Sequence, residues 1–229
     1  MSETKETLSG YSDSAYEALG ADPARKLYLQ YPGLKEAEES GGPKIKSRLD
    51  ILSLIPRNKI GAEIGVFTGR FSRALINYTK PERLYLVDAW HLLWGSHFPN
   101  WNSTAEGKLE TDAAIKATRL RTAEPKDVAK IVISESLPWL ESLPPLHLDW
   151  VYLDSSHGYK KTKMELAAIS PKMKIEGLIF LDDCRSDRSH RHHNVFRAVQ
   201  EFSKETEWEI FYLDKNNQCG MRRRCEYDN

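Results

Sequence analysis

EIGVFTGRFS, residues 63–72, is the stretch of sequence that decides the fold. It closes a short apolar run, Ile60–Phe67, which is typical of a buried strand, and it opens a segment with helical spacing, Arg70–Asn77. Glycines directly after a strand let the backbone turn tightly and approach a ligand closely. The stretch therefore predicts a strand, a tight turn and a helix, with the turn available for binding.

The same alternation continues along the chain. Short apolar runs followed by longer helical segments are typical of an α/β fold. Continuous apolar character in the middle strands indicates a parallel sheet covered on both faces. We therefore expect a Rossmann-like, doubly wound, mostly parallel sheet of about seven strands, with helices on both faces and an antiparallel late strand. The further expected strands are Leu84–Val87, Ile131–Ile133, Trp150–Leu153, Leu178–Leu181 and Trp208–Leu213, and the further expected helices are Tyr159–Ala168 and Val195–Ser203.

Two segments do not follow this alternation of strands and helices. Residues 1–43 are polar and interrupted by glycine and proline, and we expect a helical or partly ordered N-terminal extension there, followed by a helix over Ile45–Leu54. Residues 44–229 then form one domain. Within it, residues 89–129 form an aromatic-rich insertion with a helix expected from about Thr104 to Ala123. Long connections of this kind are usually functional or disordered.

Composition excludes several classes of protein. The chain has 229 residues, with 33 basic and 33 acidic side chains, and this balance argues against a nucleic-acid binder. No apolar run approaches the roughly 18 residues of a membrane span, and the polar N-terminus lacks the apolar core of a signal peptide. The three cysteines show no CxxC spacing and are typical of reduced thiols in a cytoplasmic protein.

An acid at the end of the second expected strand indicates a nucleoside ligand. Asp88 stands where a carboxylate accepts hydrogen bonds from both ribose hydroxyls. The turn lacks the third glycine of a dinucleotide fingerprint, and it carries Glu63 two residues before Gly65. An anion is unfavourable beside a pyrophosphate and favourable beside an ammonium group. The pattern therefore favours S-adenosylmethionine over NAD, although a turn with a chance aspartate is the simpler alternative.

Three further carboxylates follow the next strands of the expected sheet. Asp154 ends the fourth strand, and Asp182 and Asp183 end the fifth. If these strands are adjacent, their ends lie about 5 Å apart. Uncompensated carboxylates repel one another, and a divalent cation such as Mg²⁺ relieves the repulsion. We therefore expect a metal at this edge. The alternative is that Asp182 or Asp183 caps the following segment or binds Arg185.

Several other side chains are candidates for chemistry. His157 follows Asp154 by three residues and can act as a base, or it can cap its helix. The segment 184–194 holds three histidines and is interpreted as a basic lid, with a transition-metal site as a minor alternative because no cysteine or carboxylate has convincing ligand spacing. The aromatic side chains in the insertion can line an acceptor site or pack the insertion onto the domain. These are Trp90, Trp94, Phe98 and Trp101.

Four motifs together resemble a known family. They are E-x-G-x-x-x-G-x-x-S at 63–72, LYLVDAW at 84–90, DWVYLDSSHGY at 149–159 and GLIFLDDC at 177–184. In these motifs the chain resembles the class I S-adenosylmethionine-dependent methyltransferases over residues 45–213. The branch it resembles most is that of the small-molecule O-methyltransferases.

The resemblance implies roles for individual residues. Those with an implied cofactor role are Glu63, Gly65, Gly69 and Ser72 at the methionine part, Asp88 at the ribose, Ser136 at the adenine, and Glu135, Trp90 and Asp154 as neighbours. In the metal-dependent relatives, acids at the positions of Asp154, Asp182 and Asp183 hold the ion. The catechol enzymes place a lysine where this chain has His157, which together with Asp154 is assigned to catalysis.

These observations predict an enzyme that moves a methyl group from S-adenosylmethionine to a hydroxyl of a sugar, phenol or natural product, with help from a divalent metal. The expected partner is a small-molecule acceptor, without nucleic acid or membrane, and a homo-oligomer is possible. The alternatives are a metal-independent N- or O-methyltransferase, an NAD-dependent reductase, and a non-catalytic nucleotide-binding protein on the same fold.

Overall fold

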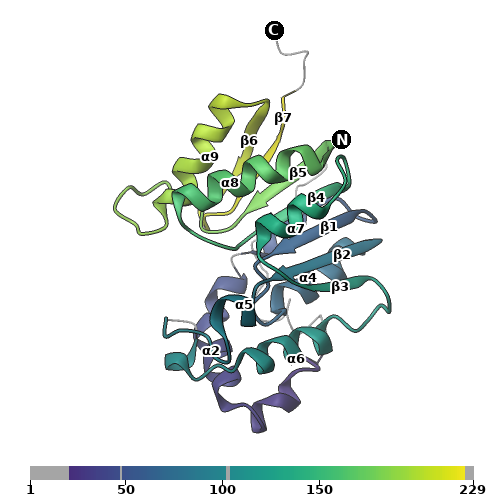
Figure 1. Ribbon diagram of the computed structural model, residues 1–229, viewed down its shortest axis with the longest axis vertical. Helices are drawn as coiled ribbons and strands as arrows, with labels where there is room; N and C mark the ends of the chain where they lie inside the picture. The colour runs from purple at the N-terminus through teal and green to yellow at the C-terminus, as the bar shows by residue number, and fades with distance from the viewer. Residues whose placement is uncertain (1–20, 47, 102–103, 225–229) are drawn as a thin grey trace, which may run out of the picture.

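A seven-stranded sheet forms the centre of the protein (Figure 1). The structure is a computed structural model that describes residues 21–46, 48–101 and 104–224. The sheet order is β3-β2-β1-β4-β5-β7-β6, in which the first five strands are parallel and β7 is antiparallel to both neighbours. The strands are β1 (Ile60–Ile64), β2 (Arg83–Asp88), β3 (Ala129–Ile133), β4 (Leu148–Leu153), β5 (Met173–Leu181), β6 (Trp208–Leu213) and β7 (Cys219–Arg223).

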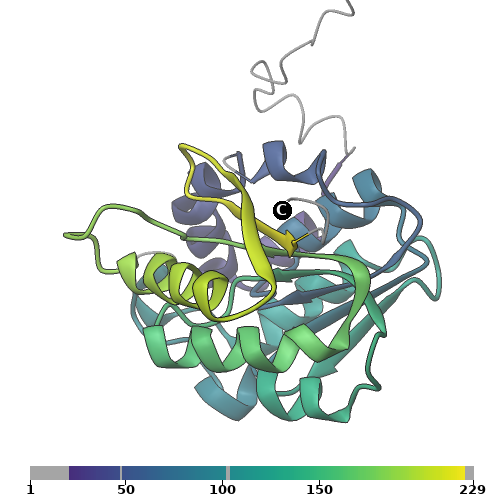
Figure 2. The same ribbon diagram turned by 90° about the horizontal axis from the view of Figure 1, so that it is seen from above.

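Helices cover both faces of this sheet (Figure 2). One face carries η1 (Arg25–Leu29), α2 (Pro32–Lys46), α3 (Leu49–Leu52), α4 (Arg70–Thr79) and α6 (Thr111–Arg121). The other face carries α7 (Ser136–Ser142), α8 (Tyr159–Ile169) and α9 (His193–Glu205). Short elements α5 (His91–Trp94), η2 (Ala105–Gly107) and η3 (Ser170–Lys172) complete the connections.

Alternation along each central strand builds the two hydrophobic clusters. In β4, Trp150 and Tyr152 pack on the face of α4 and α6, whereas Val151 and Leu153 pack on the face of α7, α8 and α9. All four side chains are buried. Since both faces are covered, the strands read as continuous apolar runs. The strand order reverses between β1 and β4, and ligands bind at such a reversal beyond the carboxyl ends of the strands.

A buried arginine ties the N-terminal segment to the domain. The guanidinium of Arg121 on α6 donates to a carboxylate oxygen of Glu38 at 2.6 Å and to one of Asp22 at 2.5 Å. Arg121 and Glu38 are each 3% exposed. A buried carboxylate without this partner is costly, because it loses its water and gains nothing in return.

The expected α/β architecture is confirmed, with differences at some boundaries. The helix expected over Ile45–Leu54 is divided, because α2 ends at Lys46 and α3 begins at Leu49, and α2 runs through the expected domain boundary at residue 43. The helix expected from Thr104 begins at Thr111, because Ala105 and Glu106 have left-handed backbone. β7 is a further strand whose residues were not among the expected ones. Residues 1–20 of the expected extension lie outside the described residues.

The described residues include no helix that is both long and apolar enough to cross a bilayer. Cys184 and Cys219 are buried free thiols, as expected of reduced cysteines, and Cys225 lies outside the described residues.

Arg121→Met should lower the free energy of unfolding by roughly 3 kcal/mol, because it leaves the Glu38 carboxylate buried without its cation. Arg119→Met on the same helix is the matched control, since Arg119 is exposed, and it should change stability by less than about 0.5 kcal/mol. Urea unfolding of the three proteins tests this. Equal stability of the two variants would show that the network does not hold the N-terminal segment in place.

Candidate active site

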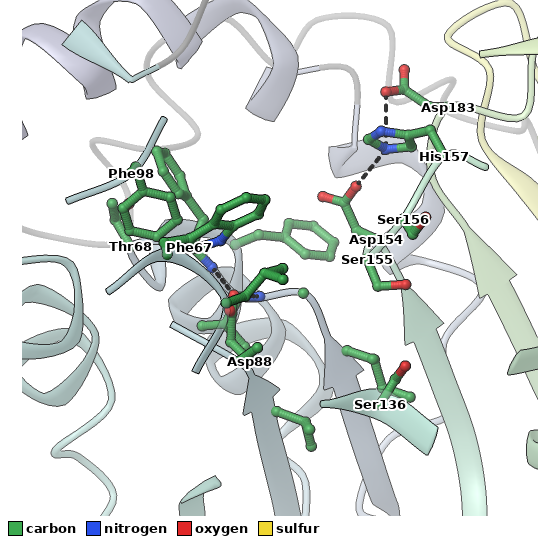
Figure 3. Close-up of a pocket in the computed structure, with 18 of the residues that line it drawn as sticks. Phe67, Thr68, Asp88, Phe98, Ser136, Asp154, Ser155, Ser156, His157 and Asp183 are labelled. Atoms are coloured by element: carbon green, nitrogen blue, oxygen red, sulfur yellow. Dashed lines mark hydrogen bonds and ion pairs between the residues drawn. The ribbon is translucent and has the colours of Figure 1, made fainter. Parts of the chain in front are cut away.

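A pocket of about 560 Å³ opens at the carboxyl edge of β1, β2, β3 and β4. This volume lies within the usual range of small-molecule sites. Figure 3 shows Asp88, Phe67 and Phe98 on one side of the pocket and Asp154, His157 and Asp183 on the other. Of the residues predicted from the sequence to act in the site, those on its wall are Gly65, Asp88, Glu135, Ser136, Asp154, His157 and Asp183. Glu63, Gly69, Ser72, Trp90 and Asp182 are not among the lining residues.

The glycines of the first turn serve close packing. Gly65 has φ of +92°, and a Cβ there would lie 1.9 Å from the carbonyl oxygen of Asp154 on the neighbouring strand end. Gly69 has φ of +75°, and its Cβ would lie 2.8 Å from the Cα of Thr118 on α6. A side chain is therefore excluded at both positions by backbone conformation and by space. These glycines set the shape of the turn that borders the pocket.

Asp88 holds that turn in place from the end of β2. One carboxylate oxygen accepts hydrogen bonds from the backbone N–H groups of Val66 and Phe67, each at 2.9 Å, and the other accepts from the N–H of Trp90 at 3.0 Å. Burial raises the pKa of Asp88, although these N–H donors act in the opposite direction. The carboxylate also lines the pocket, where it can accept further bonds from a ligand.

Glu63 lies behind the turn and not on the pocket wall. Its side chain is 1% exposed and accepts a hydrogen bond from the hydroxyl of Ser72 on α4. Burial raises the pKa of Glu63 to about 8, although Ser72 and the nearby Arg48 favour the charged form. Ser72 is therefore a hydrogen-bond donor to Glu63. Because Glu63 lies behind the turn, it can influence a bound cation only indirectly, through the turn.

The ends of β3 and β4 are joined beneath the pocket by a buried acid. Glu165 on α8 accepts hydrogen bonds from the hydroxyl of Ser136 and from that of Ser155, the latter at 2.7 Å. Glu135, the residue before Ser136, forms an ion pair with Lys161 at 3.8 Å on a more exposed part of the rim. Sequence reasoning missed Glu165, which is an acidic residue on the buried face of an amphipathic helix.

The insertion after β2 supplies an aromatic wall. Phe98 packs edge-on against Phe67 at 5.2 Å and against Trp101 at 5.9 Å, and Trp94 packs against Trp101 at 5.1 Å between ring centroids. All four rings line the pocket. Trp90 is fully buried, and its indole N–H donates to the carbonyl of Phe67 at 2.9 Å. Trp90 therefore anchors the insertion, whereas the other aromatic side chains line the pocket.

Arg48 compensates two of the three predicted metal-binding carboxylates. Its guanidinium lies 2.6 Å from a carboxylate oxygen of Asp154 and also pairs with Asp182, whose other oxygen accepts from the amide of Gln218. The strands that carry the acids are adjacent, as expected. The repulsion that motivated a magnesium site is nevertheless relieved by a cation of the chain itself. As placed, the three carboxylates do not fit a magnesium site.

Asp183, the third carboxylate, faces two histidines. Nε2 of His157 lies 3.3 Å and Nδ1 of His192 lies 2.7 Å from the same oxygen of Asp183, and Nε2 of His157 is also 3.5 Å from Asp154. Burial alone lowers the pKa of His157, but Asp154 and Asp183 outweigh it and raise that pKa. Burial and the neighbouring His157 lower the pKa of His192 to about 4.

The sequence and the structure agree on where the site lies and differ on its contents. The strand ends that carry Asp88, Asp154 and Asp183 meet at one pocket, as predicted. Arg48 was missed, because it lies in a polar segment far from the motifs and nothing local marks it. The sequence predicted that His192 lies in a basic lid. The indication that it could bind a ligand was that it is a histidine.

Comparisons with known proteins identify the fold and the family. A family model described as a methyltransferase domain matches residues 61–184, more than half of the chain. A protein of Corynebacterium glutamicum has a TM-score of 0.58 at 12% identity, covering 94% of this chain and 100% of that chain. Cofactor-bound Rv0187 from MTB has a TM-score of 0.55 at 11% identity, covering 93% and 95% of the two chains.

A proposed RNA methyltransferase from Pyrococcus horikoshii has a TM-score of 0.52 at 13% identity, covering 81% of this chain and 86% of that one. At such identities the structural likenesses show the fold alone. No curated protein matches the sequence at significant similarity.

Glu63→Gln should make the protein less sensitive to alkaline pH. A carboxyl group whose pKa is raised to about 8 stabilises the fold fully below its ordinary value of 4.5 and loses that contribution as pH rises towards 8. The melting temperature of Glu63→Gln, relative to wild type, should therefore increase between pH 5 and pH 8 in thermal unfolding scans. Glu141→Gln, at an exposed position on α7, is the control for the removal of a carboxyl group. A pH-independent difference for Glu63→Gln would contradict the raised pKa.

Proposed function

The chain belongs to the methyltransferase-domain family of class I, S-adenosylmethionine-dependent enzymes, and from that premise we propose that it methylates a hydroxyl oxygen of a small molecule. The observation that carries the proposal is the position of His157. Its imidazole lies on the pocket wall between Asp154 and Asp183, across the pocket from Asp88 (Figure 3). A hydroxyl acceptor must lose a proton during transfer, whereas a neutral amine attacks with its own lone pair.

The side of the pocket near Asp88 fits the nucleoside part of the cofactor. Asp88 offers acceptors for ribose hydroxyls, and Ser134–Ser136 border the same end of the pocket after β3. Asp88 and Glu135 are acids on this part of the pocket wall, whereas Glu63 lies behind the turn. A ligand with an ammonium group and a sulfonium, and without phosphate, matches this charge.

Methyl transfer is an in-line displacement at carbon. The bond from the acceptor oxygen to the methyl carbon forms as the bond from that carbon to sulfur breaks, and the sulfonium becomes a neutral thioether. The acceptor proton passes to His157 in this proposal. The main task of the protein is to hold oxygen, carbon and sulfur in line at about 3 Å for attack. Apolar pocket walls assist methyl transfer, because they exclude water as a competing nucleophile.

The aromatic wall of the pocket, whose Phe67 and Phe98 lie on the side of Asp88 and across the pocket from His157, favours a small ring-shaped substrate. Phe67, Trp94, Phe98 and Trp101 present aromatic surface that stacks on a phenol or on the apolar face of a sugar. The chain has no net charge, so nothing in its overall balance favours a polyanion. We therefore propose a small-molecule acceptor, with phenols and sugars as the classes to test first.

The sequence predicts assistance by magnesium, but the position of Arg48 does not favour it. Arg48 occupies the position between Asp154 and Asp182 where an ion held by these carboxylates would lie. This contact favours the alternative in which transfer does not depend on a three-carboxylate magnesium site. Equal activity with Mg²⁺ and with a chelator of Mg²⁺ is the result that this alternative predicts.

Wild-type protein should bind S-adenosylhomocysteine and should not bind NADH in isothermal titration. Asp88→Ala should weaken S-adenosylhomocysteine at least about tenfold, or about 1.4 kcal/mol, because it removes the ribose acceptor and the support of the turn. Asp112→Ala, an exposed acid on α6, is the control and should bind as wild type does. Preferential binding of NADH would overturn the assignment of the cofactor.

His157→Ala should lower kcat by about 10²–10⁴-fold on any accepted phenol or sugar, because proton removal is lost while the cofactor end of the pocket is intact. Formation of S-adenosylhomocysteine from a panel of hydroxyl compounds measures this. His147→Ala is the control, since His147 precedes β4 at the opposite edge of the sheet and bonds Tyr85. An undiminished rate in His157→Ala would contradict a role in proton transfer.

A further inference from the structure

Three side chains at the rim of the pocket converge in a way that the proposed reaction does not require. His157 comes from the turn before α8, Asp183 from the end of β5 and His192 from the residue before α9. One ligand atom from each lies within 4.8 Å of the other two. The three residues are separated by 26 and 9 positions, so only the fold brings them together.

The separations are close to those between ligands of one ion, with one of them within the usual range and the other shorter than it. The two ring nitrogens lie 3.3 Å and 2.7 Å from the same oxygen of Asp183. Nitrogen and oxygen ligands at about 2.1 Å from a tetrahedral or octahedral ion are themselves about 3.0–3.4 Å apart. The other oxygen of Asp183 faces Arg185 at 3.5 Å, which can orient the carboxylate from outside the cluster.

A second observation concerns the surroundings of these nitrogens, whose polar neighbours are carboxylate oxygens at ion-pair distance without good hydrogen-bond geometry. Nε2 of His157 and Nδ1 of His192 are both buried, and neither has a hydrogen-bond partner of acceptable geometry among the described residues. The whole of His192 is 9% exposed. Buried polar atoms of this kind usually have a partner, and a missing ion is one explanation when they lack one. Two such atoms face one carboxylate oxygen.

Backbone strain lies at the same place. Asp183 has φ of +52°, in the left-handed region that few residues other than glycine, asparagine and aspartate adopt. Such strain persists where surrounding structure imposes it, often at functional sites. Here it turns the carboxylate of Asp183 towards His157 and away from Arg48, which pairs instead with the neighbouring Asp182.

We propose that His157, Asp183 and His192 bind a divalent transition-metal ion, of the class of Zn²⁺, Co²⁺ or Fe²⁺, at the rim of the pocket. Imidazole nitrogen favours these ions, whereas Mg²⁺ prefers an all-oxygen environment. Each imidazole binds through the lone pair of its buried nitrogen, with its proton on the other nitrogen. The rings stack at 4.2 Å with 20° between their planes, so binding through both lone pairs requires one ring to turn.

The site is independent of the atom that accepts the methyl group, and only its role in catalysis rests on the proposed function. All three residues line the pocket, so open coordination positions of the ion face the ligand space. Nε2 of His157 cannot hold an ion and a proton at once. With an ion bound, His157 would hold the ion, and the ion would lower the pKa of an acceptor hydroxyl, whose proton would pass to solvent.

Calorimetric titration of the full-length, chelator-treated protein with Zn²⁺ tests the proposal. We expect one Zn²⁺ per chain, and Co²⁺ should give the visible absorption of a nitrogen- and oxygen-ligated ion. His192→Ala and the conservative Asp183→Asn should each weaken Zn²⁺ at least about tenfold. His193→Ala is the matched control, because His193 is the next residue and contacts the backbone carbonyl of Arg185 instead, and it should bind as wild type does. Excess Mg²⁺ should not displace Zn²⁺.

A crystal of the wild-type protein soaked in Zn²⁺ gives a readout that does not depend on the variants. Anomalous density between the three side chains supports the proposal. Absence of stoichiometric binding, unchanged affinity in Asp183→Asn, or density at Asp154 and Asp182 would overturn it. Titration of the same preparation with S-adenosylhomocysteine separates the two proposals: loss of that binding alone counts against the methyltransferase site, and loss of Zn²⁺ binding alone counts against the metal site.

Discussion

The compensation of negative charge at the edge of a parallel sheet is the constraint on which this structure depends. Parallel pairing places the carboxyl ends of β1, β2, β4 and β5 side by side, and each end carries an acid. Buried carboxylates in contact with one another are unstable unless they are protonated, hydrogen-bonded or paired. The protein uses protonation, hydrogen bonding and ion pairing, and the pocket lies at the strand ends that carry these carboxylates.

Each solution has its own residues. Glu63 is held close to its neutral form by burial beside Ser72, and Asp88 is satisfied by backbone N–H groups of the turn. Arg48 pairs with two acids of β4 and β5. Asp183 contacts His157 and His192 at the rim of the pocket. The result is a pocket with Asp88 on one side and with Asp154, His157 and Asp183 on the other.

The sequence predicted the strands and the position of the site, because both depend on local patterns. Apolar runs marked β1, β2 and β4, and their terminal acids marked the edge. The sequence could not reveal Arg48, since its partners stand more than 100 positions away and its own segment is polar. The contact of His192 with Asp183 spans only nine positions, but it depends on the path of the connection from β5 to α9, which no sequence pattern marks. The aromatic wall was anticipated as an alternative, but the division between anchoring Trp90 and the lining rings depends on tertiary packing.

The most direct test of the account is a crystal structure of the protein with S-adenosylhomocysteine. The account predicts that the ribose hydroxyls lie within hydrogen-bond distance of the Asp88 carboxylate, with the adenine towards Ser136 and the sulfur facing the space below His157. A ligand bound elsewhere, with Asp88 still engaged only by the turn and the pocket empty, would contradict it.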